Sequence, residues 1–254
     1  MSFKDHFSDR SADYATFRPI YPDSLIDTIA QLPGRRRLAL DCGTGNGQAA
    51  VSLARHFDRV IATDRSLEQL QHAKPNPKVD YRRAAAEASG LPDRSVDLVT
   101  AAQSLHWFDI EAFFREARRV LVANGAIAVW GYGDPILDEP ALQATLHELN
   151  RGILEPYWLP ERALLLAGYA TIEFPFEEIR MPPFTLEVSW SLAQLTGLLR
   201  TWSAAARYVA EHRRDPVAGV ERALSRDWGN PDGRRVVRWP VYLRAGRVAG
   251  TADG

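Results

Sequence analysis

Within residues 38–131, short apolar runs alternate with segments that repeat apolar residues at helical spacing. The helical segments place apolar residues three, four and seven positions apart, as at Ala50, Leu53 and Phe57, which is one buried face of a helix. Strands that alternate with helices are typical of βαβ units, so the pattern predicts an α/β fold with a doubly wound, mostly parallel sheet. Four apolar runs have the length of strands, at 38–42, 60–64, 96–101 and 126–131, and the mixed run VDYR at 79–82 reads as a weaker one.

The order of elements changes after about residue 135. A helix that ends near Gly168 leads into a strand-like run at 170–180, and three helical patterns then follow without strands between them. The run at 236–248 resembles a last strand, but Pro240 cannot donate to a ladder and implies an edge or a bulge. Before the sheet, a helix is expected near 23–32. We therefore expect an N-terminal segment, a sheet core, a C-terminal part of the same domain and a disordered tail, at 1–37, 38–135, 136–248 and 249–254.

Charge and cysteine content exclude several classes of protein. The 254 residues carry 31 Lys and Arg against 32 Asp and Glu, so the chain lacks the basic surface that binding to nucleic acid requires. Cys42 is the one cysteine, which excludes an intrachain disulfide framework. No run approaches the roughly 18 apolar residues of a membrane span, and the start MSFKDHFSDR lacks the apolar stretch of a signal peptide. We expect a cytoplasmic protein that acts as a monomer or homodimer, without a membrane partner.

The most informative stretch is LALDCGTGNGQ, where the first strand ends at Asp41. Gly43, Gly45 and Gly47 follow it, so the chain can turn sharply and its backbone can approach a ligand at the start of the next helix. Unpaired N–H groups at such a position favour electron-rich atoms. The spacing therefore indicates a nucleotide-like ligand, although a tight βα turn alone would also use these glycines.

Two observations narrow the choice of ligand. Asp64 ends the second strand about twenty residues after the turn, where a carboxylate can accept hydrogen bonds from both hydroxyls of a ribose. A dinucleotide fingerprint would place its third glycine at position 48, which is Gln48. A nicotinamide oxidoreductase of the short-chain type also needs a lysine beyond the fourth strand, and no lysine follows Lys78. That class is therefore the less favoured reading.

Four features in order then identify a family by resemblance. They are the turn DCGTGNG, Asp64, the stretch AAAEASGLPDRSVDLVTAAQSLHWFD and the amino-terminal DYATFRPIYP, which looks like a Y-x-x-x-R-P-x-Y-P pattern. Together they resemble the class I S-adenosylmethionine-dependent methyltransferases, and among these the methyltransferase type 11 group that includes trans-aconitate methyltransferase. The resemblance implies a Rossmann-like, seven-stranded sheet with an N-terminal helical lid and a helical insertion before the last strand.

The resemblance also implies how the cofactor would be held on the turn. Asp41 would orient the turn or reach the methionine amino group through water, and Gly43, Gly45 and Gly47 would admit the methionyl portion and the ribose. Asp64 would hold the ribose hydroxyls.

The adenine would lie near Arg65, the backbone of Ala86 and the side chain of Glu87. The family commonly has an Asp immediately before that Ala, and Ala85 stands there instead, so this sequence lacks that carboxylate. Gln103 would supply backbone contacts to the methionine part, and Arg18 or Tyr14 would reach its carboxylate, since a guanidinium suits a planar anion.

The acceptor side is expected at the end of the fourth strand and in the C-terminal helices. His106 is the best-placed catalytic base, or else a hydrogen-bonded histidine that shapes the site. Trp107 is a candidate contact of the acceptor, and Trp202 a candidate lining residue from region 176–235. Arg200 or Arg207 could clamp an acidic acceptor.

These expectations combine into one hypothesis. The chain would transfer a methyl group from S-adenosylmethionine to a small organic acceptor, with O-methylation of a carboxylic acid favoured and no metal required. The product of the cofactor would be S-adenosylhomocysteine. A protein of the same fold that binds S-adenosylmethionine without catalysis is the alternative.

Overall fold

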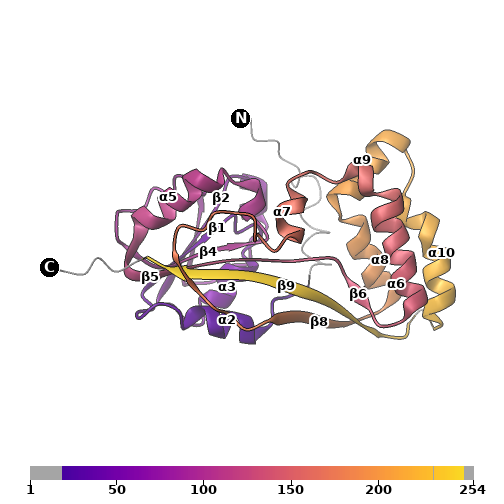
Figure 1. Ribbon diagram of the computed structural model, residues 1–254, viewed down its shortest axis with the longest axis horizontal. Coiled ribbons are helices and arrows are strands. Elements are labelled where there is room, and N and C mark those ends of the chain that lie inside the picture. Colours follow the sequence, from indigo (N-terminus) through magenta and orange to yellow (C-terminus); the bar gives the residue numbers. More distant parts are fainter. Residues whose placement is uncertain (1–18, 231, 249–254) are drawn as a thin grey trace. The chain divides into compact units, whose positions relative to one another are not determined.

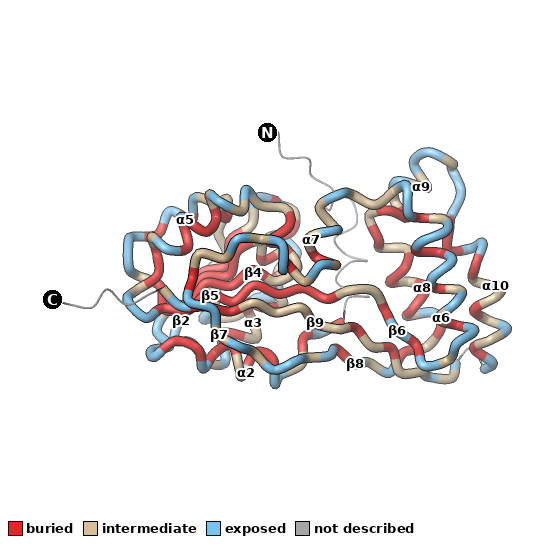
Figure 2. Tube along the Cα trace, in the orientation of Figure 1, coloured by how far each residue is buried: buried red, intermediate tan, exposed pale blue. Residues whose placement is uncertain are grey.

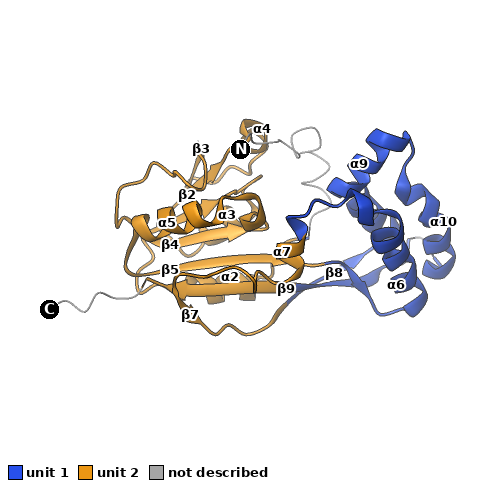
Figure 3. Cartoon of the chain, turned by 45° about the horizontal axis from the view of Figure 1, so that its top comes forward, with its two compact units in different colours: residues 1–19, 134–162, 185–240 blue, residues 20–133, 163–184, 241–254 orange. Residues whose placement is uncertain are grey.

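The computed structural model describes residues 19–230 and 232–248. These residues divide into two compact units, coloured separately in Figure 3. Unit 1 holds residues 134–162 and 185–240, and unit 2 holds residues 20–133, 163–184 and 241–248. Unit 2 therefore contains the whole predicted βαβ region together with two later segments of the chain.

The sheet of unit 2 has the predicted doubly wound order. Its five parallel strands follow the order β3-β2-β1-β4-β5, of which Figure 1 labels β2, β1, β4 and β5. The order reverses between β1 and β4, which is where open α/β sheets bind ligands at the carboxyl ends of their strands. The strands are β1 (Leu38–Cys42), β2 (Arg59–Asp64), β3 (Val79–Arg83), β4 (Val96–Ala102) and β5 (Leu121–Tyr132).

Helices cover both faces of this sheet, as Figure 1 shows. On one face, α5 buries Phe113, Ala117 and Val120 against strand residues such as Val99 and Ile127. The other face carries α2 and α3, which contact each other. Strands β1, β2, β4 and β5 are mostly buried (Figure 2), whereas the outer strand β3 is only half-buried. The helices of unit 2 are α2 (Asp23–Ala30), α3 (Gln48–Leu53), α4 (Leu67–Gln71), η2 (Leu105–Trp107) and α5 (Ile110–Val120).

The expected strand at 170–180 is wrong over most of its length. This run follows α7 (Arg162–Leu166), and within it only β7 (Glu177–Ile179) is a strand. Phe174 and Phe176 instead meet the ring of Phe114 edge-on, with centroids 5.5 and 5.7 Å away. This run is apolar because it covers α5, and not because it lies in the sheet.

Unit 1 is mostly helical. Three helices follow one another without strands between them, as predicted, and the side chain of Asp215 caps the last by accepting from the N–H of Val217 at 2.9 Å. Strand β8 was not expected, although its burial alternates with the period of a strand, with Leu186 and Trp190 buried. The elements are β6 (Ile136–Leu137), α6 (Pro140–His147), the π-helix η3 (Glu148–Ile153), η4 (Glu155–Tyr157), β8 (Phe184–Trp190), α8 (Leu192–Arg200), α9 (Ser203–His212) and α10 (Pro216–Trp228).

Strand β9 (Arg235–Arg247) is shared by the two units. Its residues 241–247 pair antiparallel with β5, and Val237 and Arg238 pair with β6. Pro240 stands between these two segments, so neither pairing needs an N–H from it. Since β7 and β8 also pair with β9, the sheet has nine strands among the described residues, not the seven expected.

Candidate functional site

The turn after β1 has the conformation that its glycines permit. Gly43, Gly45 and Gly47 have φ angles of 64°, 55° and 82°, which side chains disfavour. A Cβ atom at position 43 would lie 2.6 Å from the Cβ of Ser104, and one at position 47 would collide with Tyr81. Among the described residues, the atom nearest to a Cβ at position 45 would be Oε1 of Gln69 at 3.7 Å. The backbone at Gly45 therefore has the open space in which a ligand can approach.

Asp41 stabilises this turn from inside the sheet. Its side chain is fully buried and accepts hydrogen bonds from the hydroxyls of Thr44 at 2.6 Å and Thr100 at 2.7 Å. Burial raises the pKa of Asp41 to about 6, although the two hydroxyl donors oppose the shift. Both carboxylate oxygens are thus engaged by the protein, which favours the role of orienting the turn.

Asp64 lies directly beside the turn. One carboxylate oxygen accepts from the N–H of Gly45 at 2.9 Å, and the other accepts from the N–H of Ser66 at 2.8 Å. The side chain is half-buried, and a carboxylate has further lone pairs for hydroxyl donors. The fold therefore brings the predicted turn and the predicted acid into contact.

The residues predicted for the adenine end also lie together. Glu87 forms an ion pair with Arg65 at 2.7 Å and accepts from the backbone N–H of Asp109 at 2.9 Å. Ala86, next to Glu87, is buried. Asp109 precedes α5 and caps it, because its side chain accepts from the N–H of Ala112. The contact between Glu87 and the start of α5 is not readable from the sequence.

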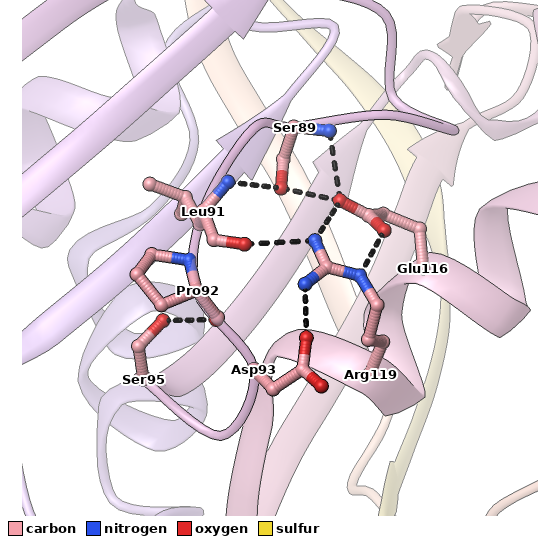
Figure 4. Close-up of polar contacts among 7 residues, drawn as sticks. All are labelled: Ser89, Leu91, Pro92, Asp93, Ser95, Glu116 and Arg119. Atoms are coloured by element: carbon pink, nitrogen blue, oxygen red, sulfur yellow. Dashed lines mark hydrogen bonds and ion pairs between the residues drawn. The ribbon is translucent and has the colours of Figure 1, made fainter.

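An ion pair whose carboxylate is buried, between Glu116 and Arg119, fixes residues 89–91 to α5 (Figure 4). Glu116 accepts from the N–H of Ser89 at 2.8 Å and from its hydroxyl at 2.5 Å. Arg119 binds the same carboxylate at 2.8 Å and donates to the carbonyl of Leu91 at 2.8 Å. Burial opposes ionisation of Glu116, but these donors outweigh it and lower its pKa. Sequence reasoning missed both charged residues, because they resemble the solvated face of a helix.

The segment after β4 packs against the turn. Ser104 donates to the carbonyl of Cys42 at 2.9 Å, and both Ser104 and Phe108 lie where a side chain at Gly43 would extend. Gln103 has a φ of 55° and donates its N–H to Trp130 at 2.8 Å. Its side chain also bonds the backbone of Tyr132.

His106 is buried and has a partner that the sequence did not suggest. Its Nδ1 lies 3.1 Å from the hydroxyl of Tyr169, a fully buried residue with a φ of 58°. Burial raises the pKa of the Tyr169 phenol. The half-buried Trp107 packs its ring 4.6 Å from that of His106. Both predicted residues thus lie on the segment that packs against the turn.

The residues expected to contact the acceptor from the C-terminal helices lie in unit 1. Trp202 is buried, with its ring 5.4 Å from that of Trp158. The guanidinium of Arg162 lies 3.9 Å above the Trp158 ring and pairs with Asp134, while its burial lowers its pKa. Arg200 is engaged by two carboxylates.

Those partners of Arg200 are Asp215 and Glu221, both at 2.8 Å, which makes Arg200 a structural residue of α8 and not a clamp for an acid. Arg207 is exposed on α9. Tyr14 and Arg18 fall outside the described residues.

Over residues 19–230 and 232–248, no cluster of three or more His, Cys, Asp or Glu side chains is arranged to hold a metal ion. In the same part of the chain, no helix has both the length and the apolar character needed to cross a bilayer.

Comparisons with known proteins agree with this geometry. A family model described as a methyltransferase domain matches residues 40–129, the stretch from β1 to β5 that contains the turn. A predicted methyltransferase of Dictyostelium discoideum is 34% identical over 247 residues, which cover 95% of this chain and 94% of that protein. An uncharacterised methyltransferase of Schizosaccharomyces pombe is 32% identical over 219 residues, 84% of each chain.

Solved structures show the same fold. A predicted type II methyltransferase of Anaeromyxobacter dehalogenans superposes with a TM-score of 0.86 at 40% identity, covering 92% of this chain and 99% of that one. A structure from Anabaena variabilis, at 19% identity and a TM-score of 0.53, shares the fold alone.

Proposed function

Because this chain belongs to the class I S-adenosylmethionine-dependent methyltransferases, we propose that it transfers a methyl group from S-adenosylmethionine to a small carboxylic acid and forms an ester. In this proposal the turn and Asp64 hold the cofactor. One observation carries it: three glycines with positive φ and an acid from the next strand meet at the point where the strand order reverses.

The residues at this place fit the cofactor. Gly45 offers an open backbone, whereas the space beside Gly43 is taken by Ser104 and Phe108. The half-buried Asp64 has lone pairs for the two ribose hydroxyls. Glu87 already accepts from Arg65 and Asp109, so a contact with the adenine amine would use a remaining lone pair of its carboxylate.

The bound cofactor supplies a methyl group on a positively charged sulfur, which a nucleophile can displace in line. The protein has to hold the acceptor oxygen in that line and exclude water. The buried segment 104–106 and the packed rings of Trp107 and Phe108 supply apolar walls at the carboxyl end of β4.

A carboxylic acid is the favoured acceptor because it is already ionised at neutral pH and needs no base. An alcohol or an amine would require a residue that removes its proton. In unit 1, Trp202, Trp158 and Arg162 form an aromatic and cationic cluster whose chemistry suits a planar acid. We propose this cluster within unit 1 and, separately, Trp107 within unit 2 as candidate contacts of the acceptor.

A thermal-shift experiment tests the cofactor part of the proposal. S-adenosylhomocysteine at about 100 times its Kd should raise the Tm by roughly 5–10 °C, because it binds only the folded state, and NAD should not. Asp64→Asn should lose most of this shift. Asp80→Asn, which changes an acid bound to Arg59 and Arg82 on β3, should keep it. A shift with NAD and none with S-adenosylhomocysteine would refute the proposal.

The acceptor part needs a separate assay. Incubation with labelled S-adenosylmethionine and a panel of small acids, alcohols and amines should give base-labile methyl esters of one or more acids. Transfer only to alcohols or amines would refute the acceptor class while leaving the cofactor assignment intact.

A further inference from the structure

The pairing of His106 with Tyr169 determines where the histidine carries its proton. Both residues belong to unit 2, and Nδ1 of His106 lies 3.1 Å from the Tyr169 hydroxyl. The two rings are inclined by 24°. Tyr169 is 0% exposed and its pKa is raised by burial, so the phenol keeps its proton at neutral pH.

The Tyr169 phenol has one proton, and the described residues offer one acceptor for it. Among the described residues, Nδ1 of His106 is the hydrogen-bond partner of the Tyr169 hydroxyl. If Nδ1 were protonated, it would donate to the phenol oxygen and leave the buried O–H of Tyr169 without an acceptor, which is costly. If Nδ1 accepts, both groups are satisfied. The neutral imidazole of His106 therefore carries its proton on Nε2.

We propose that His106 is a hydrogen-bond donor through Nε2–H toward an acceptor oxygen that is already anionic, and that Tyr169 is the positioning residue that fixes this tautomer. The inference rests on the proposed function and deepens it. A general base needs a lone pair on the nitrogen that meets the acceptor, and an Nε2–H has none. The arrangement thus selects a carboxylate over an alcohol or an amine.

The place of His106 supports this role. It lies in η2, two residues after Ser104, which contacts the turn at Gly43. A carboxylate oxygen held there by Nε2–H can attack without losing a proton. One oxygen–carbon bond then forms from an oxygen lone pair, one sulfur–carbon bond breaks with its electron pair returning to sulfur, and no proton moves.

Nitrogen NMR tests the tautomer directly, with no need for an acceptor. In the full-length protein labelled with 15N-histidine, long-range proton–nitrogen correlations at neutral pH should show a protonated Nε2 and an unprotonated Nδ1 for His106. The signals are assigned by their loss in His106→Gln. A protonated Nδ1, or protons on both nitrogens, would overturn the proposal even if S-adenosylhomocysteine binds as expected.

Tyr169→Phe should shift the Nδ1 signal and populate the other tautomer. Tyr242→Phe is the matched control, because this half-buried tyrosine of unit 2 has a hydroxyl without a hydrogen bond in the described chain. It should leave the His106 signals unchanged. If Tyr169→Phe does not fold, the wild-type spectrum still decides between the tautomers.

Two substitutions at position 106 separate donor from base. Glutamine retains an N–H donor near the position of Nε2 and cannot act as a base, whereas leucine has neither property. With a carboxylic acid acceptor, His106→Leu should lower kcat/KM by about 10- to 100-fold and His106→Gln by less than about 10-fold, as expected for one hydrogen bond to a charged group. Equal losses in the two variants, or transfer restricted to alcohols or amines, would overturn the proposal.

Discussion

In unit 2, the carboxylates of Asp64 and Glu87 accept from backbone N–H groups, so their positions follow from the path of the chain. In unit 1, the guanidinium groups of Arg162 and Arg200 contact other side chains: a carboxylate, an amide and an indole face for the first, and two carboxylates for the second. A site fixed by the backbone leaves a signature of glycines and acids in the sequence. A site built from side chains leaves almost none.

The largest effect is expected from Asp41, whose burial should make the free energy of unfolding depend on pH. Its folded pKa of about 6 lies above the ordinary 3.8, so the folded state binds the extra proton. Stability should therefore be highest below about pH 4 for this group and fall by roughly 3 kcal/mol as the pH rises to 6. Asp41→Asn should flatten this part of the curve of unfolding free energy against pH, measured with urea. An unchanged slope would show that Asp41 ionises normally.

Substitution of Gly45 tests whether the open backbone is the ligand site. Gly45→Ala should weaken binding of S-adenosylhomocysteine by about 100-fold, roughly 2.7 kcal/mol, because the new methyl group fills ligand space and touches no protein atom closely. Gly90→Ala is the matched control, since Gly90 also has a positive φ and open surroundings. Both should lose about 1 kcal/mol of stability. Calorimetry that finds equal affinities in the two variants would remove Gly45 from the site.

The ion pairs of one arginine in each unit should contribute differently to stability. Arg119 and Arg200 have side chains that are each 38% exposed, but the principal partner of Arg119, Glu116, is 8% exposed, whereas the partners of Arg200 are 36% and 39% exposed. Arg119→Met should lower the free energy of unfolding by about 2 kcal/mol, because it leaves the buried carboxylate of Glu116 without its charged partner. Arg200→Met should cost less than about 1 kcal/mol. Denaturant unfolding measures both, and equal costs would contradict the distinction.

The smallest effect is expected in the aromatic cluster of unit 1. Trp202→Phe should raise the KM for the acceptor by about 5-fold, near 1 kcal/mol, and leave the affinity for S-adenosylhomocysteine unchanged. Trp228→Phe, a buried tryptophan whose indole donates to Gly233, is the control. A change in cofactor affinity for Trp202→Phe, or none in KM, would reject Trp202 as an acceptor residue.

The sequence predicted the parts of the site that depend on local chemistry. The glycine turn and Asp64 were readable because a sharp turn needs glycine and a strand end places its last side chain. Tyr169 was not readable, because it lies 63 residues from His106 and looks like any apolar core residue. The same holds for Glu116, which is 27 residues from Ser89.

For the fold as well, the features set by local sequence were predicted and those set by distant contacts were not. Four of the five parallel strands were predicted because buried strands are continuous apolar runs, whereas the half-buried β3, with its sequence VDYRR, gave a weaker signal. The run at 170–180 was wrongly predicted as a strand, because a segment that covers a helix with aromatic residues has a composition similar to that of a strand. Strand β8 was missed because its alternating pattern is short and half-exposed.

The pairing of β5 with β9 can form only after nearly the whole chain has been synthesised. The partner of Ala126 in β5 is Arg247, so the outer edge of β5 has no covering strand until the chain has been made far beyond the helices of unit 1. An uncovered edge invites pairing with other chains, and contacts between such distant residues form slowly. A nascent chain, or one cut before residue 241, would therefore expose an unpaired edge of β5 that is prone to aggregation, whereas β9 covers this edge in the full-length protein.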